Sequence, residues 1–378
     1  MSAASAGTPP VEASGHVAGP HAYRWARGIL LGASLGITFV AGVANLIPAF
    51  AEAPRSMTVG VVFWPVFAAA LWWVIGKIPF FARMPRGTKW LAFLWGAAVA
   101  GAVAGLLEVP IGSTMALAGG AAAEWVPAAV APFIEETSKA LGVLVVFLFL
   151  RRPFTLVDGF ATGAMVGLGF QISEDLGYGA TNAWMAGSDG WAAIVQSLLP
   201  RAVTGVFSHW LLTGVFGVGL AYLFVKKSAG WGKRVGVLVA LGAAAMAMHF
   251  LWNSPGPDGF AGTWVVPAVK ALVILIVGLL VMRWARDDEG IFYTRYLNTL
   301  DPEVVTGDER VALARGRNRF GARRVAARSG GWAGWRHQGR LQRAQAALAV
   351  DLAVGNVAWS DVKTDRRRCP EGRGGRYR

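Results

Sequence analysis

The stretch Ala131-Pro-Phe-Ile-Glu-Glu-Thr-Ser-Lys-Ala140 places three charged side chains inside the segment Trp125–Leu150, which holds no other charged residue and is long enough to cross a membrane. Each charge within a bilayer costs roughly 2.5–3.5 kcal/mol or more. Glu135 lies four residues and Glu136 three residues before Lys139, so the three side chains can meet on one helix. Such a group needs partners from other segments. The stretch is therefore predicted to be the centre of a functional site.

The composition excludes a soluble globular protein. The chain has 378 residues, of which 54% are hydrophobic and 15% charged, with 17 tryptophans. Repeated apolar runs of about 20 residues predict an all-α, polytopic integral membrane bundle. A single cysteine, Cys369, excludes an internal disulfide and a cysteine metal cage. The net charge of +14 is typical of basic cytoplasmic loops and tails, so no nucleic-acid partner is expected.

About eight membrane-spanning helices are predicted. Basic residues gather in alternate connections between them and acidic residues in the others, which places both termini in the cytoplasm. Glu108 and Glu124 are assigned to an outer connection on this basis. The predicted spans are 28–50, 57–76, 90–107, 125–150, 156–178, 200–225, 235–253 and 264–282.

The chain divides into a cytoplasmic N-terminal arm (1–27), a transmembrane domain (28–284, with its polar motifs in 125–255) and a basic cytoplasmic tail (285–378). The tail holds 19 Lys and Arg against 11 Asp and Glu. A short amphipathic helix is predicted at about 337–354. The arginines of the last residues, 366–378, are expected to be attracted to the anionic inner leaflet of the bilayer.

Four consecutive spans place polar residues at one depth, between the middle of the membrane and its outer face. A shared site explains this agreement better than four separate structural roles. The residues are Glu135, Glu136 and Lys139, then Glu174 and Asp175, then Arg201 and His209, and finally His249 and Asn253.

These residue types suit general acid–base catalysis. One carboxylate of the pair Glu135 and Glu136 can exchange protons with water and act as a general base. His209 and His249 can bind a metal or stabilise an oxyanion. Glu174, with the four residues above, completes the predicted catalytic set, as a third ligand or as the partner of an imidazole. Four residues are expected to support it: Asp175 in the same role as Glu174, Asn253 as a donor, and Lys139 and Arg201 as counter-charges.

The pattern Glu135-Glu136-x-x-Lys139, Phe170-x-x-x-Glu174-Asp175-x-x-Tyr178, Arg201 with His209, and His249-x-x-Trp252-Asn253 resembles the PrsW family of intramembrane proteases. It also looks related to the CAAX prenyl endopeptidases, although Glu174 stands where those have histidine. Asp175 departs from the asparagine that is common in PrsW-like sequences. The resemblance implies cleavage of membrane-anchored regulatory proteins, such as anti-sigma factors, at the extracytoplasmic side of a bacterial plasma membrane.

Two catalytic forms and two other functions stay open at this stage. His209, His249 and Glu174 could form a zinc site with an open fourth position, or a carboxylate could activate water without metal. The lack of cysteine ligands and the carboxylate pair slightly favour the metal-free form. A proton-coupled transporter would also use buried Glu, Lys and His residues. A scaffold that acts through its tail would leave the intramembrane cluster unexplained.

Overall fold

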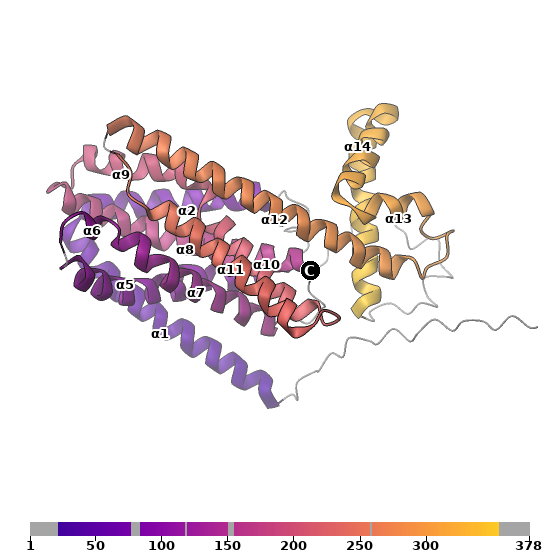
Figure 1. Ribbon diagram of the computed structural model, residues 1–378, viewed down its shortest axis with the longest axis horizontal. Coiled ribbons are helices and arrows are strands. Elements are labelled where there is room, and N and C mark those ends of the chain that lie inside the picture. The colour runs from indigo at the N-terminus through magenta and orange to yellow at the C-terminus, as the bar shows by residue number, and fades with distance from the viewer. Residues whose placement is uncertain (1–21, 77–83, 118, 150–154, 258, 355–378) are drawn as a thin grey trace, which may run out of the picture.

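The computed structural model describes residues 22–76, 84–117, 119–149, 155–257 and 259–354. Within these residues every regular element is helical and no strand occurs, which confirms the predicted all-α class (Figure 1). Most of the helices form one elongated bundle, and α13 and α14 lie beyond one end of it.

The bundle contains three interrupted segments as well as continuous helices. The continuous ones are α1 (Ala22–Glu52), α2 (Pro54–Gly76), α6 (Ala121–Glu124), α7 (Val126–Phe149), α8 (Leu156–Met185) and α11 (Trp231–Asn253). The interrupted ones are α4 (Arg86–Leu94) with a π-helical turn (Trp95–Ala100) and α5 (Gly101–Ala116); α9 (Trp191–Thr204) with a 3₁₀ turn (Gly205–Phe207) and α10 (His209–Val225); and a π-helical turn (Ala261–Val265) with α12 (Val266–Leu297). The last helices are α13 (Gly307–Ala314) and α14 (Gly316–Val354).

Six helical segments among the described residues are long and apolar enough to cross a membrane. The two predicted spans outside this set are α7, which carries three charged residues, and α8, a continuous helix whose apolar pattern is broken by glycines and acids. These two helices hold the polar cluster at the centre of the bundle. The six segments are Leu31–Glu52, Pro54–Gly76, Arg86–Met115, Trp191–Val225, Trp231–Asn253 and Ala261–Leu297.

Two predicted spans differ from the structure in ways that affect the site. The span predicted at 200–225 breaks at Ser208, whose φ of −88° and ψ of −107° are not helical, and α10 starts at His209. The span predicted to end at 107 continues in α5 to Ala116. The assignment of Glu108 to an outer connection was therefore wrong, because this carboxylate finds partners inside the bundle and the helix does not have to end before it.

Helix α8 is buried along its whole first half and packs closely against α10. A Cβ atom added at Gly159, Gly163 or Gly167 would lie 2.4, 2.1 or 2.2 Å from a carbonyl oxygen of α10. Only glycine permits this approach of the two backbones. The close packing that small residues at this spacing suggest is thus present, and it fixes α10 relative to α8.

The C-terminal helices build a second, smaller core. Helix α12 continues beyond residue 284 and buries Tyr293 and Leu297 against α13 and α14. Helix α14 is longer than the short helix expected at 337–354 and bends at Gly331, where φ is +54°. The Phe320 ring packs edge-on against the Trp335 ring across this bend, with 5.3 Å between centroids. The N-terminal arm up to residue 21 and the residues 355–378 lie outside the described residues.

Candidate active site

The two carboxylates of α7 lie in the interior of the bundle next to the lysine one turn further on. Glu135, Glu136 and Lys139 are 1%, 0% and 0% exposed. The Lys139 Nζ atom lies 2.6 Å from Glu136 Oε1 and 3.1 Å from Glu135 Oε2. The same ammonium stands over the Phe170 ring, 4.1 Å from its centroid. Burial of one charge alone would be strongly destabilising, so the lysine makes the buried carboxylate pair tolerable.

His249, near the end of α11, connects Glu136 to Asn253. Asn253 Nδ2 donates to His249 Nε2 at 3.3 Å, and His249 Nδ1 lies 3.0 Å from Glu136 Oε1. Because an amide nitrogen can only donate, Nε2 accepts and Nδ1 carries the proton that goes to Glu136. The Nε2 atom also lies 3.6 Å from Glu135 Oε2. The imidazole is therefore held in one orientation between the two carboxylates of α7.

His209 is the first residue of α10 and is fully buried. Lys139 Nζ donates to its Nδ1 atom at 3.2 Å, and the ring meets the His249 ring edge-on with 5.4 Å between centroids. Its Nε2 atom lies 2.7 Å from Glu174 Oε2 but lacks the alignment of a hydrogen bond, and it has no other hydrogen-bond partner among the described residues. Because α10 starts directly after the break at Ser208, the His209 imidazole lies in the site, and its Nε2 atom makes no aligned hydrogen bond.

Arg201 of α9 binds the two acids of α8. Its Nη2 atom donates to Glu174 Oε2 at 2.9 Å, its Nε atom donates to Asp175 Oδ1, and its guanidinium stacks 3.7 Å from the Tyr178 ring centroid. The side chains of Arg201 and Glu174 are 19% and 13% exposed, so they form the edge of the site. Asp175 accepts from Arg201, a role that the oxygen of an asparagine could also fill.

Glu108 of α5 is a member of the site that the sequence analysis missed. Its carboxyl group lies near the charges of Glu135, Glu174 and Lys139. Its Oε1 atom is buried without a hydrogen-bond partner among the described residues. The available signal was the apolar pattern, since Val109 and Ile111 continue it beyond the acid.

All nine residues predicted from the sequence lie in one connected network. Lys139 joins the carboxylate pair to His209, Glu174 joins His209 to Arg201, and Glu136 joins the pair to His249. The nine residues are Glu135, Glu136, Lys139, Glu174, Asp175, Arg201, His209, His249 and Asn253.

The residues at the centre of the network fit a divalent metal ion. Glu135, Glu136, His209 and His249 each offer one ligand atom, and these atoms all lie within 4.8 Å of one another. Two imidazoles with carboxylates suit zinc and similar ions. The Lys139 ammonium now contacts three of these four residues. Glu174, which was expected as a ligand, contacts His209 from the other side and pairs with Arg201.

The charge balance of the site also fits a cation. Five carboxyl groups surround the two permanent cations Lys139 and Arg201, which leaves three negative charges in excess when all are ionised. Buried charges need compensation, so protons or a divalent ion must offset part of this excess. The five groups are those of Glu108, Glu135, Glu136, Glu174 and Asp175.

A comparison with protein families supports the resemblance found in the sequence. A family model described as PrsW family intramembrane metalloprotease matches residues 84–282, which is more than half of the chain. The matched region contains Glu108 and all nine residues of the network. No curated protein and no solved structure matches the chain.

Proposed function

The chain belongs to the PrsW family of intramembrane metalloproteases, and from this premise we propose that it hydrolyses a peptide bond of a membrane-anchored regulatory protein near the extracytoplasmic face of the plasma membrane. The observation that carries the proposal is the buried pair Glu135 and Glu136 in contact with two histidines from different helices. A proton-coupled transporter is not favoured, because the family is one of peptidases.

Hydrogen bonding distinguishes the roles of the two carboxylates. Glu136 accepts from Lys139 at 2.6 Å, from His249 at 3.0 Å and from Thr213 at 3.3 Å. A carboxylate that already accepts three hydrogen bonds is a poor base. Glu135 accepts from Lys139 at 3.1 Å, while the two imidazoles lie 3.6 and 3.8 Å away, beyond hydrogen-bond distance, so it has more free accepting capacity. Glu135 is therefore the general base that takes a proton from water, and Glu136 positions His249.

The remaining residues complete the reaction. Glu135 passes the proton on to the leaving amine, as a general base does when it becomes an acid. His209, whose Nδ1 atom accepts from Lys139 and whose Nε2 atom therefore carries the proton beside Glu174, donates to the negative charge that develops on the scissile carbonyl oxygen. Lys139 and Arg201 compensate the carboxylates throughout. Water reaches the site at its edge, where Glu174 and Arg201 are partly exposed.

A divalent metal is the cofactor that this residue set suits best, and it would be held by His209 and His249 with a carboxylate of α7. When bound it would polarise the scissile carbonyl as a Lewis acid. The family description and the charge balance favour the metal-dependent form over the metal-free form that the sequence alone favoured.

The test uses the full-length protein in detergent and a peptide that contains a transmembrane segment. Glu135→Gln should lower kcat by about 10³-fold or more with little change in KM, because the amide cannot accept a proton. Glu136→Gln should lower it less, since the amide oxygen can still accept from Lys139 and His249. Glu124→Gln on α6, an exposed acid, is the matched control and should be active. Full activity of Glu135→Gln would place the base elsewhere.

A further inference from the structure

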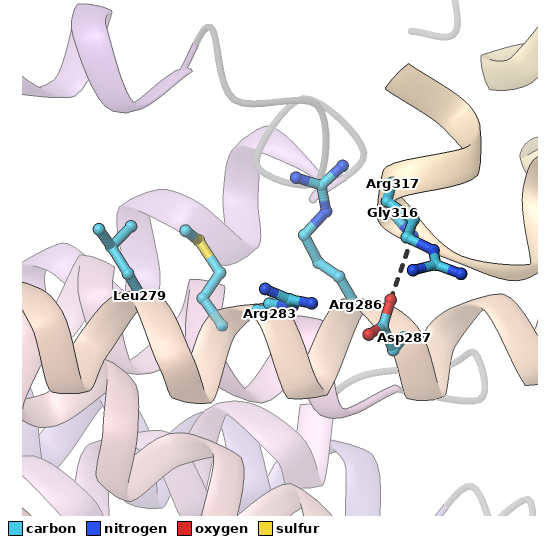
Figure 2. Close-up of a pocket in the computed structure, with 7 residues that line it drawn as sticks. Leu279, Arg283, Arg286, Asp287, Gly316 and Arg317 are labelled. Atoms are coloured by element: carbon cyan, nitrogen blue, oxygen red, sulfur yellow. Dashed lines mark hydrogen bonds between the residues drawn. The ribbon is translucent and has the colours of Figure 1, made fainter. Parts of the chain in front are cut away.

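A cavity with a volume of about 360 Å³ lies outside the active site, where α12 meets the start of α14. Figure 2 shows its two kinds of lining: Leu279 on α12, and then the arginines of α12 and α14 further along. The lining residues are Leu279, Met282, Arg283, Arg286, Asp287, Gly316 and Arg317. We refer to this group as the arginine pocket.

The arginine pocket stands at the level where the apolar part of α12 ends. The sequence from Val266 to Met282 contains one charged residue, Lys270, and the next seven residues contain five. The Trp284 ring stacks on the Tyr222 ring with 5.7 Å between centroids. Aromatic residues gather at the boundary between a membrane and water. The pocket therefore spans this boundary, with its apolar side toward the bilayer.

The three arginines of the pocket lining outnumber its single acid, Asp287. Asp287 Oδ1 accepts from the Gly316 backbone N–H at 3.1 Å, Asp288 pairs with Lys226, and Glu289 lies 3.4 Å from Arg319. Among the residues that the structure describes, Arg283 and Arg317 form no ion pair, and both are exposed.

The surroundings of the pocket add further positive charge. Helix α14 contains eight arginines and one acid, Asp351. Burial lowers the pKa of the Arg323 guanidinium, and so do the charges of three neighbours, Arg343, Arg286 and Arg319. Like charges held this close attract an anion strongly.

We propose that the arginine pocket binds the phosphate group of an anionic phospholipid. The guanidinium groups of Arg283, Arg286 and Arg317 can donate paired hydrogen bonds to phosphate oxygens, which is the geometry that makes arginine a good phosphate ligand. Leu279 and Met282 offer an apolar surface to the glycerol and the first carbons of the acyl chains. A free phosphate ion has no apolar group that could contact this surface. The proposal does not depend on the peptidase activity.

The experiment measures lipids that stay bound to the detergent-purified full-length chain by native mass spectrometry. Phosphatidylglycerol is compared with phosphatidylcholine that has the same acyl chains, with and without millimolar inorganic phosphate. The double variant Arg283→Gln/Arg317→Gln should bind phosphatidylglycerol about tenfold more weakly or worse, as expected for lost charge-assisted hydrogen bonds. The matched control Arg324→Gln/Arg328→Gln removes the same charge from exposed positions of α14 outside the pocket and should bind normally.

Three outcomes would overturn the proposal: equal loss in both double variants, equal binding of phosphatidylcholine, or complete displacement by inorganic phosphate. The last result would identify a site for free phosphate. Leu279→Gln also distinguishes a phospholipid from free phosphate, because it should weaken lipid binding and leave phosphate binding unchanged. If Arg283→Gln/Arg317→Gln fails to fold, Arg317→Gln alone should bind phosphatidylglycerol about threefold more weakly, and unchanged binding would refute the pocket.

Discussion

Replacement of Gly167 by alanine should separate the effect of helix packing from that of the catalytic groups. The added Cβ atom would lie 2.2 Å from the carbonyl oxygen of His209, whereas real Cβ atoms do not approach a neighbour closer than 3.0 Å. The start of α10 must therefore move by about 1 Å. A shift of this size at a catalytic group can lower a rate by about 10²-fold. Overpacking costs about 1–3 kcal/mol, which exceeds the gain of about 1 kcal/mol from placing alanine in a helix.

The assay is kcat/KM for cleavage of a membrane peptide, together with the thermal unfolding midpoint of the purified protein. Gly177→Ala on the same helix is the control, because its added Cβ would meet nothing within 4 Å. That variant should keep full activity and be as stable as the parent or more so. Normal activity and stability in Gly167→Ala would refute the close contact between α8 and His209.

Three further predictions concern the metal, the additional carboxylate and the topology. Active protein should contain about one divalent metal per chain, and His249→Ala should lose metal and activity together; activity that survives chelation in metal-free protein would contradict this. Glu108→Gln should lower kcat by about 10-fold or more, because it removes an ionisable group beside Glu135 and Glu174, whereas the exposed amide Asn298→Ala should have no effect; an unchanged kcat would exclude Glu108 from the site. Reporter fusions after Lys227 and after Arg286 should both report a cytoplasmic location, and an external signal at either position would invert the proposed orientation.

The part of the site that could be predicted from the sequence is the part that lies within single helices. Glu135, Glu136 and Lys139 meet because of their spacing in α7, and His249 and Asn253 meet because of theirs in α11. Helical periodicity fixes such contacts before any tertiary packing is known. Their common depth then suggested that the helices meet.

Features that depend on neighbouring helices were not predicted. Glu108 looked like the end of a span, and only the packing of α5 against α7 shows that it belongs to the site. At the break before α10, the buried Gly205 carbonyl accepts from the Ser208 backbone N–H and hydroxyl and also from Gln171 Nε2 of α8 at 3.2 Å, so a neighbouring helix takes part in it. Pro200 and Gly205 hinted at an irregularity but did not fix its position.

The glycine contacts between α8 and α10 also decide how a substrate can arrive. Carbonyl oxygens of α10 rest directly on α8, so a transmembrane segment that diffuses sideways in the bilayer has no gate between these two helices. Its path must therefore lie between other helices. An apolar groove of about 400 Å³ runs between α7, α10 and α11, lined by Thr137, Leu141 and Val239 among others, and Leu141 and Val239 are exposed on its surface. The close contact between α8 and α10 thus excludes one side of the bundle as an entry for a substrate helix.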